Sequence, residues 1–267
     1  PFTAESPTIM VAEPAGATPW SAYFRFRLTC DSPGPVAPQA VEIRCIETGE
    51  NFAITLTGNC IPRPSVATQL VFDQSGSMLS LTDEGRTKEQ VLKDSAGVFV
   101  DLLYDDNGIG INAYDHDPHE LMNNAVAGSP GSGDGRDEAL DKIADFSANP
   151  DGLTAIGDGI ELAKSKLDDV VYDEKAMVVL TDGIETADKY IADVADGVIN
   201  QKVFAIGLGT AEQIRPSALS ALTSGTDGYL LMTGNLSSDD SFLLAKYYLQ
   251  ILAGVNNNDI IFDPEGI

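Results

Sequence analysis

The chain has 267 residues, of which 43% are hydrophobic, and its 16 basic and 41 acidic side chains give a formal net charge of −25. This charge argues against nucleic acid and anionic membrane surfaces as partners, because their phosphate groups are bound through Lys and Arg. No stretch approaches the roughly 18 consecutive apolar residues of a membrane helix, so we expect no direct membrane insertion. The length suits one large domain with a smaller module.

The first part of the chain, residues 1–62, is predicted to be a small β module. Segments 22–28, 41–46 and 52–57 alternate apolar and polar residues, and residues 47–50 supply a hairpin turn. Three or four strands are marginal alone, so we expect the module to pack against the larger domain or to complete a sandwich with other strands. It loosely resembles the end of an immunoglobulin-like module and would then be incomplete.

All three cysteines, Cys30, Cys45 and Cys60, fall in this module. Zinc binding is disfavoured, because no fourth ligand is nearby. Two interpretations stay open: one disulfide with a remaining thiol suits a secreted protein, whereas three reduced thiols suit the cytosol. We favour a disulfide between Cys30 and Cys60, because both residues end β-like runs.

Beyond residue 66 the hydrophobic period changes, and helical patterns alternate with short apolar strands. This alternation predicts a buried parallel sheet covered by helices, with one strand returning antiparallel. The expected strands are 67–72, 110–114, 121–125 (antiparallel), 176–181, 203–208 and 229–232. The expected helices are 88–104, 136–146, 155–167, 190–201, 215–223 and 237–255.

Oxygen-bearing side chains stand where these elements end or begin. Asp73, Ser75 and Ser77 follow the first apolar strand on a tight turn. Thr154 comes just before a helical pattern, and Asp182 ends another apolar strand. Ligands of open α/β sheets bind beyond the carboxyl ends of the strands, and Mg²⁺ takes oxygen ligands. We therefore expect the five side chains to converge on one Mg²⁺, with Mn²⁺ or Ca²⁺ as alternatives.

Three separated motifs carry a resemblance to a known family. D-x-S-x-S at 73–77, G-x-T-x-x-G at 152–157 and T-D-G at 181–183 resemble the metal-ion-dependent adhesion site of the von Willebrand factor type A domain, over residues 66–255. The resemblance implies an α/β fold with a doubly wound, mostly parallel six-stranded sheet and helices on both faces. It also implies an ion with an open coordination position, which accepts the Asp or Glu carboxylate of a protein partner.

Each motif also has a plainer interpretation. D-x-S-x-S is common in turns, because Asp and Ser side chains bond to neighbouring backbone N–H groups. Thr154 can cap the helix that follows it, and Asp182 can be an ordinary turn residue. The metal site is favoured because three independent strand or loop ends would each need a coincidental oxygen.

The only two histidines of the sequence lie in the polar turn 115–120, which follows a strand. A second metal site is one interpretation, but exposed turn residues account for both histidines without a ligand role. We instead expect His116, Asp117 and His119 to form a rim that contacts a partner.

Enzymatic motifs are missing from the sequence. It has no phosphate-binding G-x-x-x-x-G-K-[ST] loop, no G-x-S-x-G nucleophile elbow and no H-E-x-x-H. Ser75 and Ser77 have no sequence-evident activating base. A Mg²⁺-dependent phosphotransferase with Asp73 as nucleophile is the best enzymatic alternative, although the second carboxylate of a D-x-D site is absent.

These observations predict a non-enzymatic, metal-dependent protein-binding module of the adhesion type, outside the cell or at its surface. The alternative is a structural subunit of a surface assembly, in which the ion only stabilises the fold. Residues 256–267 resemble a following strand or a return strand, and the chain begins at Pro1. We therefore expect a piece of a longer polypeptide, whose other domains are further partners.

Overall fold

The computed structural model divides into two compact units, Pro1–Arg63 and Pro64–Ile267. Among the described residues, no helix combines the length and the apolar composition that crossing a membrane requires. The described residues are 2–4, 24, 26–30, 32–46, 48–60, 64–82, 85–182, 184–195, 201–209, 214, 216–233, 246–247 and 249–254.

The first unit is built from two antiparallel strand pairs. Strands β1 (Phe2–Ala4) and β2 (Phe26–Leu28) form one pair, and the long strands β3 (Gly34–Arg44) and β4 (Asn51–Cys60) form the other. The predicted hairpin turn between β3 and β4 is present, and the backbone of Cys45 closes it through hydrogen bonds with Gly49 and Glu50. The small β module is therefore a pair of two-stranded sheets within the described residues.

A disulfide bond joins Cys30 and Cys60, the pair that the sequence favours. Their Cα atoms are 5.7 Å apart, within the range that a disulfide spans. Cys45 is half-buried and takes no part in this bond. The bond ties the end of β4 to the segment after β2, and a small unit with few core residues gains stability from such a link.

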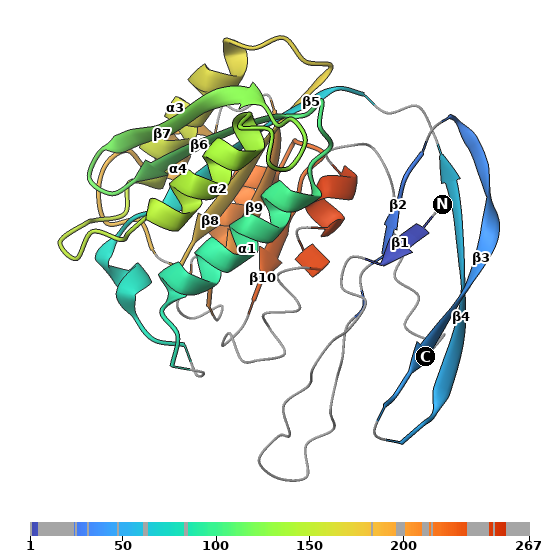
Figure 1. Cartoon of the computed structure of the whole chain (residues 1–267). Coiled ribbons are helices and arrows are strands. Elements are labelled where there is room, and N and C mark those ends of the chain that lie inside the picture. The colour runs from blue at the N-terminus through green and yellow to red at the C-terminus, as the bar shows by residue number, and fades with distance from the viewer. Residues whose placement is uncertain are drawn as a thin grey trace. The chain divides into compact units, whose positions relative to one another are not determined.

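The second unit is built around one six-stranded sheet with strand order β10-β9-β8-β5-β6-β7 (Figure 1). Every neighbouring pair is parallel except β6 and β7. The strands are β5 (Val66–Asp73), β6 (Gly108–Tyr114), β7 (Pro118–Val126), β8 (Glu174–Thr181), β9 (Lys202–Gly207) and β10 (Leu230–Met232).

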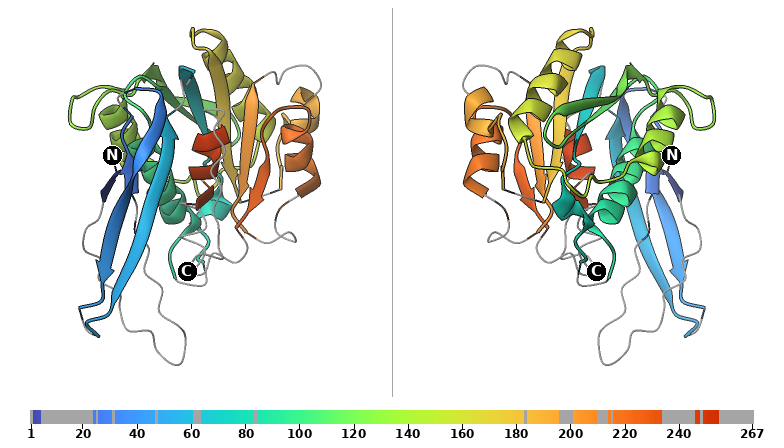
Figure 2. Two further views of the ribbon diagram at one scale, coloured as in Figure 1. Left: turned by 90° about the vertical axis from the view of Figure 1, so that its right-hand side faces the viewer. Right: turned by 90° about the vertical axis from the view of Figure 1, so that its left-hand side faces the viewer.

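Helices cover both faces of this sheet, which is the doubly wound arrangement (Figure 2). Successive side chains of β5 point to opposite faces of the sheet and pack into two different cores. Leu70 and Phe72 belong to one hydrophobic cluster, and Val71 belongs to the other. The first cluster includes residues of α1 and α2, and the second includes residues of α3, α4 and α5. The helices are η1 (Gly76–Leu79), α1 (Lys88–Leu102), α2 (Gly135–Asp145), α3 (Ile156–Asp168), α4 (Ile191–Val194) and α5 (Pro216–Thr223).

The predicted α/β fold class is confirmed, and most expected elements differ from the observed ones by a few residues at their ends. The short 3-10 helix η1 was not expected, because its four residues, the first two of which end the D-x-S-x-S motif, carry no helical periodicity. Of the expected helix 237–255, residues 246–247 and 249–254 are helical and the others lie outside the described residues, as does the whole segment 256–267.

Arg136 of α2 is a buried charge that closes the end of α1. Its side chain is 1% exposed, and its guanidinium donates hydrogen bonds to the backbone carbonyls of Val100, Asp101, Leu103 and Gly128. The last carbonyls of a helix have no partner within the helix, so a buried helix end needs such donors. Arg136 thereby fixes α2 against α1 on one face of the sheet.

The glycines of α3 allow the helix to approach the sheet closely, and this gives a stability test. A Cβ atom on Gly159 would lie 2.5 Å from Cδ1 of Tyr114, which is fully buried, whereas a Cβ atom on Gly97 of α1 would meet only Leu140 at 3.9 Å. We expect Gly159→Ala to lower the free energy of unfolding by about 1–3 kcal/mol through overpacking. Gly97→Ala should leave it unchanged or raise it by up to about 1 kcal/mol, because Ala favours a helix. Urea denaturation of both variants measures this, and equal effects would contradict the close approach of α3.

Candidate metal centre

The candidate site lies beyond the carboxyl ends of β5 and β8, which are neighbouring parallel strands. Their register pairs Phe72 with Leu180, so Asp73 at the end of β5 lies beside the end of β8. Asp182 follows β8 directly. Both Asp side chains are buried. The parallel register therefore brings two carboxylates from distant parts of the sequence to one edge of the sheet.

Four of the five predicted ligand residues are joined by a chain of hydrogen bonds. Oδ1 of Asp73 accepts from the backbone N–H of Ser75 at 2.9 Å, and the hydroxyls of Ser75 and Ser77 lie 2.9 Å apart. The Ser77 hydroxyl then donates to Oδ1 of Asp182 at 2.7 Å. The second oxygen of Asp73 accepts from the hydroxyl of Thr181 at 2.6 Å. This chain runs from one carboxylate to the other through the backbone N–H of Ser75 and the hydroxyls of Ser75 and Ser77.

Thr154 lies on the neighbouring loop, just before α3, and it is buried. Its loop is joined to the Asp73 loop by a backbone hydrogen bond from Gly76 to Gly152 of 3.1 Å. The backbone N–H of Thr154 donates to the hydroxyl of Thr186, and its carbonyl accepts from the Thr186 N–H. Among the described residues, the Thr154 side chain is not part of the hydrogen-bond chain that joins the other four.

The electrostatics of the site favour the arrival of positive charge. Burial and, after it, the negative charge of Asp182 raise the pKa of Asp73 from 3.8 to about 6, against the hydrogen bonds from Ser75 and Thr181, which lower it. Burial also raises the pKa of Tyr114 well above 10, and the negative charge of Asp73 adds to this effect. The tyrosine is therefore neutral, and the two carboxylates carry the negative charge of the site.

Lys88, which the sequence analysis did not single out, contacts one of these carboxylates. Its Nζ lies 2.6 Å from Oδ2 of Asp182, and its side chain is largely buried. It is the first residue of α1, directly after the N-cap Thr87. A lysine at this end of a helix is unusual, because the helix dipole places partial positive charge there. That mismatch is the only local signal that could have pointed to Lys88.

The expected rim residues lie at the β6–β7 turn, which is joined to the Thr154 loop. The carboxylate of Asp115 accepts hydrogen bonds from Nε2 of His119 at 2.8 Å and from Nδ2 of Asn149 at 2.7 Å. Partial burial opposes ionisation of Asp115, but these hydrogen bonds outweigh it and lower its pKa to about 2. His116 and Asp117 are exposed, whereas His119 is half-buried.

The residues present fit a hard divalent cation. Asp73, Asp182 and the three hydroxyl residues offer only oxygen donors, which is the donor type that Mg²⁺ takes in proteins. The raised pKa of Asp73 reflects its burial first and the like charge of Asp182 second, and a cation would be stabilising in such a place. Three or more His, Cys, Asp or Glu side chains do not gather into a metal-binding group anywhere in the described part of the chain. A metal at Asp73 therefore depends on hydroxyl ligands.

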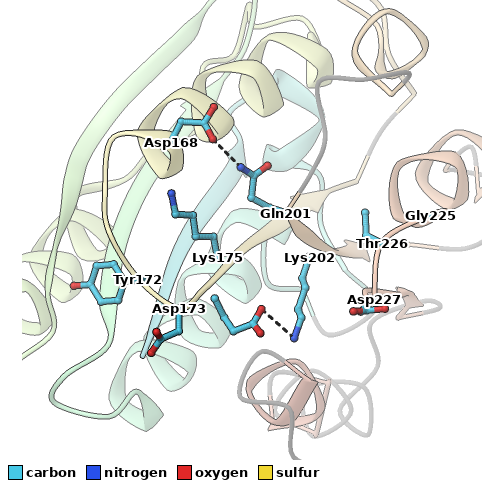
Figure 3. A pocket seen from close by; sticks show the side chains of 10 residues that line it. Asp168, Tyr172, Asp173, Lys175, Gln201, Lys202, Gly225, Thr226 and Asp227 are labelled. Atoms are coloured by element: carbon cyan, nitrogen blue, oxygen red, sulfur yellow. Dashed lines mark hydrogen bonds and ion pairs between the residues drawn. The ribbon is translucent and has the colours of Figure 1, made fainter. Parts of the chain in front are cut away.

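A pocket of about 420 Å³ lies at the amino ends of β8 and β9, at the edge of the sheet opposite to Asp73 and Asp182 (Figure 3). Its polar side chains pair with one another, since Gln201 donates to Asp168 and Lys202 lies 3.5 Å from Glu174. Its walls carry both signs of charge, which points to no single class of ligand. The Asp73 site is the stronger candidate because its like charges are buried together.

Comparisons with known proteins agree with this fold. The family model described as the von Willebrand factor type A domain matches residues 69–242. No curated protein matches the chain.

Solved structures share the fold at low sequence identity. Proximal thread matrix protein 1 from the mussel byssus is 19% identical with a TM-score of 0.56, over 69% of this chain and 47% of that chain. A structure of the same mussel protein with a zinc-occupied MIDAS motif is 18% identical with a TM-score of 0.54, over the same shares of the two chains. The PilB minor pilin from Streptococcus sanguinis is 13% identical with a TM-score of 0.57, over 88% of this chain and 82% of that chain. This chain thus spans about half the length of the mussel protein.

The raised pKa of Asp73 predicts a pH dependence of the metal-free protein. The folded state holds the proton more tightly than the unfolded chain, so the stabilising contribution is complete below pH 3.8 and is lost as the pH rises through about 6. A pKa difference of about 2 corresponds to a loss of about 3 kcal/mol.

Denaturation in EDTA from pH 4 to 7 should show this loss in the wild type relative to Asp73→Asn, which has no carboxylate to ionise. The other acidic groups are common to both proteins and cancel in the difference. A difference in unfolding free energy that stays constant with pH would show that Asp73 ionises normally.

Proposed function

We propose a function for this chain from one established premise: it belongs to the von Willebrand factor type A domain family. Domains of this family are protein-interaction modules, generally without enzymatic activity. We infer that this domain binds a protein partner through a divalent cation held at the ends of β5 and β8. The chain of hydrogen bonds that joins Asp73, Ser75, Ser77 and Asp182 is the observation that carries this proposal.

Each ligand residue would have a distinct role. Asp73 and Asp182 would supply the negative charge that holds the ion, and Ser75, Ser77 and Thr154 would supply neutral oxygens. When bound, the cation would supply an electrophilic centre for an Asp or Glu carboxylate of the partner. Because three of the five ligands are neutral, the two carboxylates would no more than balance a divalent charge, and a further anion could still be attracted.

Mg²⁺ is the proposed ion, with Mn²⁺ and Ca²⁺ as alternatives. Zn²⁺ is a further alternative, because one structure of the mussel protein has a zinc-occupied MIDAS motif, the metal-ion-dependent adhesion site. The partner-contacting rim would be formed by His116, Asp117 and His119, whose turn is joined to the Thr154 loop through Asp115 and Asn149. Hydrogen bonds that hold Asp115 also hold these two loops together, so the rim and the ion site would move as one body.

An enzymatic role for Asp73 is less well supported. The side chain is fully buried, and both of its oxygens accept hydrogen bonds, from Ser75 and from Thr181. A nucleophilic carboxylate must reach the phosphorus atom of a bulky phosphoryl group, whereas a small cation needs only a remaining lone pair on an oxygen that already accepts a hydrogen bond. We therefore retain ligation of a cation, rather than phosphoryl transfer, as the role of this carboxylate.

We propose that the domain acts outside the cell or at its surface. The Cys30–Cys60 disulfide supports this location, because disulfides persist in oxidising compartments. Two similar folds are a thread matrix protein of the mussel byssus and a minor pilin. These two proteins also favour a second candidate function, a structural subunit of a surface assembly in which the ion stabilises the fold without contacting a partner.

Calorimetric titration of metal-free protein tests the ion site. We expect one saturable site for Mg²⁺ or Mn²⁺, with binding reduced at least about 100-fold in Asp73→Ala and Asp182→Ala, because each variant removes one of two charged ligands. Asp141→Ala on the exposed side of α2 removes the same charge elsewhere and should bind as the wild type does. Folded wild-type protein that binds none of the four cations would refute the metal-dependent function.

Selection from a peptide-display library separates the adhesive function from the structural one. In Mg²⁺, the adhesive function predicts enriched peptides that contain Asp or Glu, and replacement of that residue by Asn or Gln should weaken binding at least about tenfold. No peptide should be retained in EDTA. If EDTA lowers the melting temperature but selection in Mg²⁺ yields no metal-dependent peptide, the structural function is the better account.

A further inference from the structure

Lys88 is a positively charged residue that directly contacts the proposed ion site. Its side chain is 12% exposed, and it meets the Asp182 side chain, which is 0% exposed. The ammonium contacts Oδ2 of Asp182, while the Ser77 hydroxyl holds Oδ1. Both oxygens of this carboxylate are therefore engaged by groups of the protein itself.

The position of Lys88 is unfavourable for its own helix. It is the first residue of α1, where the helix dipole favours negative charge, and Glu89 is the next residue. The Thr87–Gln90 capping box already satisfies this helix end without a lysine. The contact with Asp182 offsets this unfavourable placement. The ammonium of Lys88 therefore stabilises the candidate metal site rather than the end of α1.

The charges of the site explain why such a contact forms. Asp73 and Asp182 are both buried and are joined through Ser75 and Ser77, so that their like charges repel each other in a place with little water. An unpaired buried carboxylate is costly, and a buried ammonium beside it lowers that cost. A divalent cation would meet the same need, but it would be repelled by the ammonium and would compete with it for Asp182.

We propose that Lys88 is an internal counter-ion that stabilises the metal-free site and competes with the divalent cation for Asp182. The inference rests on the proposed function, since it assumes a cation at Asp73 and Asp182. Lys88 is a positioning and affinity-setting residue rather than a ligand. It keeps the site folded without metal and weakens metal binding, so that the ion binds reversibly.

The test compares Lys88→Met with Lys142→Met. Methionine keeps the length of the side chain and removes its charge, and Lys142 is exposed on α2, so both variants change the net charge equally. Calorimetry with Mg²⁺ and Mn²⁺ should show at least tenfold tighter binding to Lys88→Met than to the wild type, and no change for Lys142→Met. In EDTA, Lys88→Met should melt at least about 5 °C lower than the wild type, because Asp182 is left unpaired.

Further variants keep the result interpretable. Lys88→Arg retains the charge and should keep both the wild-type affinity and the metal-free melting temperature within error. If Lys88→Met does not fold without metal, Lys88→Met combined with Asp182→Asn should restore folding in EDTA, because the unpaired charge is gone. Failure of the double variant to recover stability would overturn the counter-ion role.

The two levels of the proposal fail in different ways. Equal Mg²⁺ affinities for the wild type and Lys88→Met, with binding intact in both, would overturn the competition and leave the metal site in place. A folded wild type that binds no divalent cation would overturn the metal site. In that case a lower melting temperature of Lys88→Met in EDTA would still support the pairing of Lys88 with Asp182.

Discussion

The repulsion between two buried carboxylates is the constraint on which the site depends. Asp73 and Asp182 are held at the ends of adjacent parallel strands by a continuous ladder from Val66–Glu174 to Phe72–Leu180. The chain cannot relieve their repulsion by a local movement, because both strands are buried on their two faces. Hydroxyl donors, an ammonium or a bound cation can relieve it, and the structure contains the first two. The rest of the site is an arrangement of such partners around this fixed pair.

Backbone hydrogen bonds, in addition to the side-chain contacts, hold the loops around the pair in place. Gln74 donates its N–H to Tyr114 and accepts from Asn149, and Gly76 donates to Gly152. A Cβ atom on Gly76 would lie 2.4 Å from the carbonyl oxygen of Pro150, so a larger residue would push these loops apart. Three loops from distant parts of the sequence thus form one rigid edge of the sheet. Preorganisation of this kind lowers the entropy lost when a ligand binds.

The sequence predicts the framework well and the partners of the carboxylates poorly. Apolar runs with oxygen side chains after them mark the ends of β5 and β8, so Asp73 and Asp182 could be found from local pattern. The contacts of Lys88 with Asp182 and of Thr181 with Asp73 could not, because they join residues 94 and 108 positions apart and leave no periodic signal. The burial of Arg136 could not be predicted either, because a charged residue on a helical pattern is ordinarily exposed.

The overall charge of the chain and the charge at the ion site would have opposite effects on an acidic partner. A formal net charge of −25 repels an acidic partner at long range, whereas a divalent ion at Asp73 and Asp182, with Lys88 beside them, would make the site locally positive. Salt weakens the long-range repulsion over about 10 Å at 0.1 M, but it screens charges in contact much less. A carboxylate partner would therefore be selected by contact at the site rather than by attraction from a distance. Such a surface would discriminate against acidic proteins in general and would admit one whose carboxylate reaches the ion.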